Sequence, residues 1–221
     1  MLVTVIPARN EQKTINLVAS EAAERSRYVI VVDDGSTYST DGEARRAGVD
    51  VIYTPGLGYA TAVIAGVRKA LDYGATMIVT MDAGGSHYAG EISTGASKLI
   101  VESYDLVVGT RVVSNASPLR RGLTLAAALV VSRALDRSIP DATSGFRWYN
   151  RKAAFQLVED RALELLSNHS FNAITLIRAA RAGLKIGWSP IYYRASGSSL
   201  TMRSALRSGM EIIRECRKKS S

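Results

Sequence analysis

Short apolar runs alternate with helix-length amphipathic stretches along the first 110 residues. Runs rich in β-branched residues lie at 2–6, 28–32, 49–53, 76–81 and 105–109. The stretches between them, at 11–25, 40–47, 58–73 and 89–103, have apolar residues at roughly helical spacing. Continuous apolar strands separated by helices of this length are typical of a parallel sheet covered on both faces. The pattern predicts an α/β fold with a mostly parallel central sheet and helices on both faces.

The second half of the chain has a less regular pattern. In order, it predicts a basic loop (111–121), an apolar helix to about residue 135, a polar loop (136–145), a short segment (146–149), a helix (171–182) and a last strand (184–189). We expect residues 1–195 to form one domain.

A basic amphipathic helix is predicted at the C-terminus, after a Ser/Gly-rich loop at 195–199 that we expect to be mobile. Apolar residues recur at helical spacing between Met202 and Ile213. Another face carries Arg203, Arg207, Arg214 and Lys218. Such a helix can lie in a membrane interface or pack on its own domain, and periodicity favours neither. We treat residues 196–221 as a segment made of this loop and helix.

The composition is that of an ordinary globular protein, with 47% hydrophobic and 22% charged residues in a chain of 221. It excludes a disordered or collagen-like chain. Cys216 is the only cysteine, so an internal disulfide is excluded and a reducing compartment is expected. No apolar stretch approaches the ~20 residues that cross a bilayer, and the N-terminus lacks a signal-peptide layout. These features predict a soluble, intracellular protein.

The charge is divided unevenly along the chain. Residues 1–116 carry 10 Lys and Arg against 13 Asp and Glu, whereas residues 117–221 carry 18 against 7. A basic second half indicates a surface that meets an anion, such as phosphate, nucleic acid or an acidic membrane, or simply a solvated basic face. Nucleic acid is disfavoured because aromatic residues are few and do not alternate with the basic ones.

Polar and glycine residues concentrate in the loops that follow the predicted strands, where parallel sheets bind their ligands. Asp33 and Asp34 are adjacent carboxylates that need donors or a cation nearby, and ribose hydroxyls or base N–H groups would serve. An N-cap role for this turn is the alternative, since Ser36 follows. Asp82 ends another strand, where a divalent cation could neutralise a diphosphate. His87 could be a ligand, a phosphate contact or a structural residue.

Five motifs occur in order at sensible spacings. They read VIPARNE at 5–11, VIVVDDGST at 29–37, GxGYxxA at 56–62, MDAGGSH at 81–87 and DATSGFRWY at 141–149. Together they resemble the family-2 glycosyltransferases of GT-A fold, and the SGFR motif after DxT points to the dolichyl-phosphate (polyprenyl-phosphate) sugar transferases, mannosyltransferases and glucosyltransferases. The resemblance covers about two thirds of the chain.

The resemblance implies a role for each motif. The donor nucleotide sugar would be bound by Pro7, Ala8, Arg9, Glu11, Asp33, Asp34 and Asp82. The acceptor or phosphate side would comprise Arg111, Arg120, Arg121, Ser144 and Arg147. The residues expected to take part in catalysis are Asp82, Arg147 and Asp141. Asp141 would act as a base or orient Arg147, unless it only caps the turn before Thr143.

One position departs from the family pattern. The DxD motif reads Asp82-Ala83-Gly84, so the second carboxylate, the expected principal ligand of Mg²⁺ or Mn²⁺, is missing, and Ser86 replaces an amide of some relatives. Three interpretations stay open. Asp82, His87 and the donor diphosphate hold the metal; arginines replace it; or the protein is inactive.

The most specific hypothesis is an inverting transferase that moves a sugar, mannose or glucose first, from a GDP- or UDP-sugar to dolichyl or polyprenyl phosphate. A phosphate monoester is already largely ionised at neutral pH, so it needs no strong base. The enzyme would work at the cytoplasmic membrane face, held by its basic helix or by a membrane-anchored partner subunit. A non-catalytic nucleotide-sugar-binding subunit and a transferase of polysaccharide synthesis are the alternatives.

Overall fold

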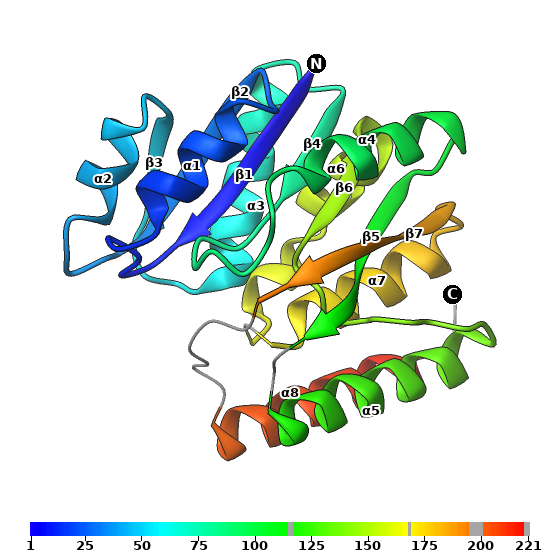
Figure 1. The fold of residues 1–221 in the computed structure, drawn as a ribbon. Coiled ribbons are helices and arrows are strands. Elements are labelled where there is room, and N and C mark those ends of the chain that lie inside the picture. Colours follow the sequence, from blue (N-terminus) through cyan, green and yellow to red (C-terminus); the bar gives the residue numbers. More distant parts are fainter. Residues whose placement is uncertain (115–116, 168, 195–200, 219–221) are drawn as a thin grey trace.

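A computed structural model describes residues 1–114, 117–167, 169–194 and 201–218 (Figure 1). Within them, one seven-stranded sheet has the order β3-β2-β1-β4-β6-β5-β7. The strands are β1 (Leu2–Ala8), β2 (Tyr28–Asp34), β3 (Asp50–Thr54), β4 (Met77–Thr80), β5 (Leu106–Ser114), β6 (Arg147–Asn150) and β7 (Ile186–Tyr193). β6 runs antiparallel to both of its neighbours, and the other pairs are parallel. The predicted α/β class with a mostly parallel sheet is confirmed.

Helices cover both faces of the sheet because successive strand residues point to opposite sides. The helices are α1 (Ile15–Ala23), α2 (Thr40–Arg46), α3 (Tyr59–Asp72), α4 (Glu91–Val101), α5 (Pro118–Leu135), α6 (Arg151–Glu159), α7 (Phe171–Arg181) and α8 (Met202–Arg217), with a 3-10 turn η1 (Arg161–Leu165). In β1, Val3 and Val5 pack with α3, α6 and α7. Ile6 faces the other side and packs with α1, α2 and α4.

Two elements differ from the sequence expectation. β5 continues to Ser114, so Arg111 lies on a strand and not in a loop. The extension exists because β7 pairs along it in parallel from Leu106 onwards. Helix α6 was not predicted, although Asn150 caps it by accepting a hydrogen bond from the backbone N–H of Ala153 (2.9 Å).

The C-terminal helix packs on the rest of the chain. Ile212 belongs to the core, and Arg178 of α7 donates to Glu215 of α8 (Nε to Oε1, 2.9 Å). α5 and α8 lie side by side as a further layer beyond α7 (Figure 1). No helix in the described ranges has a window long and apolar enough to span a bilayer. The loop expected to be mobile, at 195–199, lies outside the described residues.

The sheet topology brings the polar loops to one edge. β1, β2 and β4 are parallel neighbours, so their carboxyl ends carry the loops at 7–11, 33–37 and 82–87 to the same place. Antiparallel β6 starts there too, since Arg147 is paired with Thr80 at the end of β4. The motif at 141–149 therefore meets the loop of Asp82 although some 60 residues separate them.

Candidate active site

A cavity of about 780 Å³ lies at this edge of the sheet and extends between α5 and α8. Of the residues predicted from sequence, those that line it are Pro7, Ala8, Arg9, Glu11, Asp34, Asp82, His87, Arg111 and Arg120. Those outside its lining are Asp33, Arg121, Asp141, Ser144 and Arg147. The fold thus brings most of the predicted donor side and two of the predicted acceptor-side arginines around one space.

The two adjacent carboxylates after β2 have different tasks. Asp33 Oδ1 accepts the backbone N–H of Ser36 (2.9 Å) within the turn, and the N-cap residue of α2 is Ser39, so Asp33 caps no helix. Asp34 accepts the hydroxyl of Thr54 (2.7 Å) and the backbone N–H of Gly58 (2.8 Å). Gly58 has φ 105°, a conformation that favours glycine, and it precedes α3. Asp34 therefore fixes the start of α3, and with it Tyr59, at the cavity.

Asp82 presents its carboxylate to the cavity, and His87 holds it from behind. The backbone N–H of Asp82 donates to His87 Nδ1 (3.3 Å), and His87 Nε2 lies 3.9 Å from Asp82 Oδ2. The His87 ring is 1% exposed and packs against Phe146 and Tyr193. Burial lowers the pKa of His87, which favours the neutral imidazole.

These contacts decide which groups fit a divalent metal. Asp82 offers carboxylate oxygen, the ligand type that Mg²⁺ and Mn²⁺ prefer, and its side chain is 38% exposed. His87, the other predicted ligand, is buried beside Asp82, and its Nδ1 already accepts the Asp82 backbone N–H. No group of three His, Cys, Asp or Glu side chains suited to a metal exists in the described part of the chain. Asp82 is thus the side chain that fits the cation, and substrate oxygens would have to complete the set.

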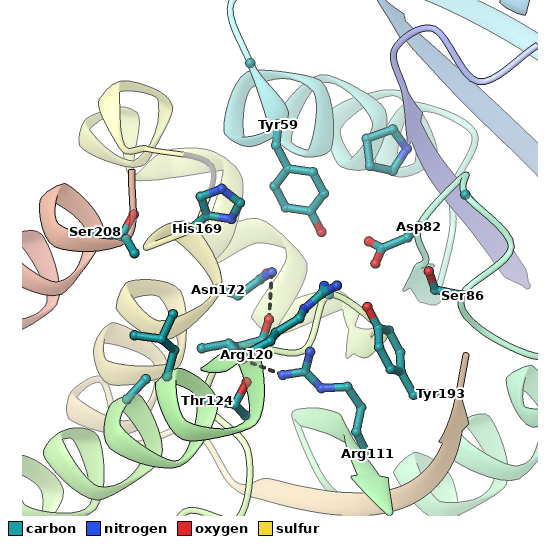
Figure 2. A pocket seen from close by; sticks show the side chains of 18 of the residues that line it. Tyr59, Asp82, Ser86, Arg111, Arg120, Thr124, His169, Asn172, Tyr193 and Ser208 are labelled. Atoms are coloured by element: carbon teal, nitrogen blue, oxygen red, sulfur yellow. Dashed lines mark hydrogen bonds between the residues drawn. The ribbon is translucent and has the colours of Figure 1, made fainter. Parts of the chain in front are cut away.

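Tyr59 and Asn172 complete the polar centre of the cavity, and sequence reasoning missed both as site residues (Figure 2). Gly145 allows Tyr59 and Asp82 to come close to the turn, because a Cβ there would lie 2.6 Å from the Tyr59 hydroxyl and 2.9 Å from Asp82 Oδ1. Burial, and then the charge of Asp82, raise the pKa of the Tyr59 phenol, so it remains a neutral hydrogen-bonding group. The glycine of the SGFR motif was the available signal. A glycine can indicate that another group comes close to the backbone, but the sequence does not show which group it is.

Asp141 pairs with Arg111 instead of acting as a base. Arg111 donates to it from Nε (2.7 Å) and Nη2 (2.9 Å), and Asp141 Oδ1 also accepts the backbone N–H groups of Thr143 (2.9 Å) and Ser144 (3.2 Å). Burial alone would raise the pKa of Asp141, but these donors outweigh it and the pKa is lowered. A carboxylate with a lowered pKa and with its oxygens occupied by donors is a weak base. It orients Arg111, not Arg147, and caps the turn.

Arg147 is fully buried and faces away from the cavity. Nε donates to the carbonyl of Ser144 (2.8 Å), Nη1 to the Thr175 hydroxyl (2.8 Å), and Nη2 to the carbonyls of Ala142 (3.1 Å) and Asn172 (2.6 Å). Hydrogen bonds to oxygens compensate the buried charge. Arg147 was expected to contact a substrate phosphate. In the structure its guanidinium instead holds the SGFR turn against α7. Ser144 is buried in the same turn.

Arg120 is the cation that faces the middle of the cavity (Figure 2). Its guanidinium lies 5.5 Å from the ring centroid of Tyr193, and that of Arg111 lies 5.2 Å from the same ring. Within the described residues, no carboxylate pairs with Arg120. Arg121, the next residue, is exposed outside the lining. The cavity therefore has carboxylates at the strand-end side and two arginines on the other.

Comparison with known proteins identifies the family and the fold. The family model described as "Glycosyl transferase family 2" matches residues 4–157. The undecaprenyl-phosphate mannosyltransferase of Micrococcus luteus is 30% identical over 205 residues, 87% of this chain and 83% of the relative. The UDP-N-acetylglucosamine–dolichyl-phosphate N-acetylglucosaminyltransferase of Methanococcus voltae is 27% identical over 86% of this chain and 84% of its own length.

Among solved structures, glucosyl-3-phosphoglycerate synthase of Mycobacterium tuberculosis in complex with Mn²⁺, UDP and glucosyl-3-phosphoglycerate shares the fold, with a TM-score of 0.72 and 18% identity. The similarity covers 97% of this chain and 78% of that one. The fold is the GT-A fold. The chain belongs to glycosyl transferase family 2, and it is a glycosyltransferase.

Proposed function

We propose that this glycosyltransferase moves a sugar from a nucleoside-diphosphate sugar to a polyprenyl phosphate. The observation that carries the proposal is the chemical division of the cavity. The strand-end side is polar and carries Asp82, the middle carries Arg111 and Arg120, and the far side is an apolar groove between α5 and α8. The groove is lined by Leu123, Ala126, Ala127, Val130, Gly209 and Ile212. Small and apolar side chains suit an isoprenoid tail, and the arginines suit its phosphate.

The donor occupies the strand-end side in this proposal. Pro7, Ala8, Arg9 and Glu11 line the part assigned to the nucleoside. Asp82 would hold Mg²⁺ or Mn²⁺ together with the donor diphosphate, and the cation would supply charge neutralisation of the leaving group. GDP and UDP sugars, and mannose and glucose, are the donors to be tested first.

The chemistry needs no protein base. An ionised phosphate oxygen attacks the anomeric carbon, the bond from that carbon to the diphosphate oxygen breaks, and the electron pair leaves with the nucleoside diphosphate, which inverts the anomeric centre. On the groove side of the cavity the described lining holds arginines and neutral groups but no carboxylate. Arg111, held by Asp141, and Arg120 would offset the repulsion between the two phosphate groups.

The proposal is tested by two measurements on the full chain. Thermal unfolding with GDP- and UDP-sugars, with and without Mn²⁺, should show stabilisation by one nucleotide class. Transfer from that donor to farnesyl phosphate should then give an isoprenyl-phosphate sugar, and farnesol should not serve. Transfer to farnesol, or to neither acceptor while nucleotide sugars bind, would overturn the acceptor assignment.

We propose that α5 and α8 also hold the enzyme at the cytoplasmic face of a membrane. Leu125, Leu129, Leu206 and Met210 are each more than half exposed on these neighbouring helices, and the exposed arginines include Arg133, Arg203, Arg207 and Arg214. Apolar side chains among cations suit an anionic lipid surface. The double variant L206S/M210S should bind anionic liposomes several-fold less in sedimentation. The control L17S, an exposed leucine on α1, should bind like wild type, and equal retention of all three would reject this surface.

A second candidate function is a non-catalytic nucleotide-sugar-binding subunit, and Gly84 in place of the second motif carboxylate is the observation that favours it. G84D restores that carboxylate. If neither wild type nor G84D transfers sugar with Mg²⁺ or Mn²⁺ while both bind nucleotide, the binding function is the correct one. Transfer by the wild type excludes it.

A further inference from the structure

His169 lies in the cavity wall, and the mechanism above does not use it. It precedes α7, and Figure 2 shows its imidazole between Ser208 and Tyr59, on the opposite side of the cavity from Asp82. It therefore lies where the polar centre passes into the groove between α5 and α8. Within the described part of the chain, no residue hydrogen-bonds the imidazole. A half-buried ring that faces a cavity without a protein partner has its N–H group available to a ligand.

Ser167 and Ser170, which flank His169 in the sequence, form hydrogen bonds with α8. Glu211 accepts hydrogen bonds from the backbone N–H of Ser167 (3.2 Å), from the Ser167 hydroxyl (2.7 Å) and from the Ser170 hydroxyl. The Ser167 hydroxyl also lies 2.9 Å from that of Ser208. Arg207, one turn earlier on α8, also donates to Glu211 (Nε to Oε1, 3.1 Å), so the charge of Glu211 is engaged by these serines and by Arg207, and not by His169. Ser167 and Ser170 are thus anchored to α8 on either side of His169, and such support helps to orient a binding group.

The surroundings of His169 favour an uncharged ring beside an unpaired cation. Burial, and then the positive charge of Arg120 on α5, lower the pKa of His169. The other groups that face it are Tyr59 of α3, whose pKa is raised, and the Ser208 hydroxyl of α8. A neutral imidazole can donate one hydrogen bond, and Arg120 supplies charge. The pair suits a doubly charged anion with several acceptor oxygens, the properties of a phosphate monoester.

We propose that His169 and Arg120 together bind the phosphate of the acceptor, with His169 as a neutral N–H donor. This assignment rests on the proposed function, because it places the phosphate of the proposed acceptor between Asp82 and the groove. Arg120 and His169 grip the phosphate from α5 and from the start of α7, which leaves one oxygen to face the donor side. A phosphate monoester satisfies both groups, whereas the corresponding alcohol leaves the arginine unpaired.

The pair of His169 and Arg120 is tested by titration calorimetry of farnesyl phosphate into the full chain. The nucleoside diphosphate that stabilises the chain is present, and no turnover is needed. His169→Phe keeps a ring without N–H and should weaken binding about tenfold, since a hydrogen bond to a charged group is lost. His169→Gln keeps a neutral donor and should stay within about threefold of wild type. R120A should lose more than H169F, while the control R25A, at an exposed arginine after α1, should change little.

The pH profile separates a neutral donor from a charged one. Between pH 6 and 8 the affinity of H169Q should follow that of wild type, because the second ionisation of the phosphate sets both profiles. Wild type that gains affinity over H169Q as pH falls would identify an imidazolium and overturn the neutral role. Equal affinity of H169F and wild type, or no binding of farnesyl phosphate by wild type, would overturn the assignment itself.

Binding and transfer measurements together show whether the His169–Arg120 pair or the proposed function is wrong. Inorganic phosphate should compete with farnesyl phosphate, and farnesol should not. If wild type transfers sugar to farnesyl phosphate and H169F does so with unchanged KM, the function stands and the pair fails. If wild type binds farnesyl phosphate through His169 and Arg120 but transfers nothing, the pair stands and the function fails. Nucleotide binding and thermal unfolding of each variant confirm that it folds.

Discussion

The two sides of the cavity are built in opposite ways. On the strand-end side, Asp34 accepts two protein hydrogen bonds and fixes the start of α3, so the site there is assembled before any ligand arrives. On the groove side, the side chains of Arg120 and His169 have no protein hydrogen-bond partner among the described residues. Groups that are satisfied internally shape a site, whereas groups left unpaired await a ligand of complementary charge. Under the proposed function, the groove side is therefore where the phosphate of the acceptor would bind.

Asp82 is the exception on the strand-end side, since its carboxylate is directed into the cavity. D82N keeps the shape but removes the charge, and we expect transfer to fall about 100-fold or more because the group that complements a cation at the diphosphate is lost. Steady-state kinetics with the donor found by thermal unfolding would measure it. The control D72N, an exposed aspartate at the end of α3, should retain activity, and a D82N enzyme of normal rate would remove Asp82 from the catalytic centre.

The pair of Arg111 and Asp141 supports the middle of the cavity, and breaking it should cost stability. D141N leaves a largely buried guanidinium uncompensated, so we expect the free energy of unfolding to fall by about 3 kcal/mol. Chemical denaturation at pH 7 measures it. E43Q, which breaks the exposed ion pair with Arg46, should cost less than about 0.5 kcal/mol.

The same pair gives a pH dependence with a definite sign. The pKa of Asp141 is lowered in the folded protein, so its contribution to stability is complete above the unfolded value of about 3.9 and is lost as pH falls through the folded pKa. The gap between wild type and D141N should therefore be constant from pH 5 to 7 and narrow below about pH 4. A gap that widens in acid would contradict the lowered pKa.

Gly145 joins the two sides, and adding a methyl group there should have the smallest of these effects. The Cβ of G145A would displace the Tyr59 hydroxyl and Asp82 Oδ1, so we expect kcat/KM for the donor to fall about tenfold with a stability loss of about 1–3 kcal/mol. G122A is the matched control, because a Cβ there meets nothing within 4 Å. Unchanged kinetics of G145A would show that Tyr59 and Asp82 need no contact across this turn.

Local sequence signals carried the strand-end side of the site. Asp34 and Asp82 follow strands that their apolar runs reveal, and parallel strands bring their ends together, so both could be placed in one cavity from spacing. Asp33 was placed in the same turn, but it accepts a hydrogen bond from the backbone of Ser36 within that turn and lies outside the cavity lining. A turn motif determines where a carboxylate lies and leaves open whether the backbone or a ligand uses it.

The groove side depended on contacts far apart in the chain. Arg147, in the most specific motif, was expected to touch phosphate. Its neighbours Phe146 and Trp148 point to the other face of the sheet, so Arg147 points to α7 and is buried against it. Tyr59 belongs to the GxGYxxA motif, whereas His169 and Asn172 lie at the start of α7, outside the five motifs, and nothing in the sequence marks these residues as partners.

By itself the sequence determined the α/β class, the family and the strand-end loops, because hydrophobic period and turn chemistry act over a few residues. Only the tertiary structure decided which arginines face the cavity, what Asp141 pairs with, and that α5 and α8 enclose an apolar groove. Those outcomes depend on which side chains find a hydrogen-bond partner once distant segments pack, and burial settles that competition over the whole fold.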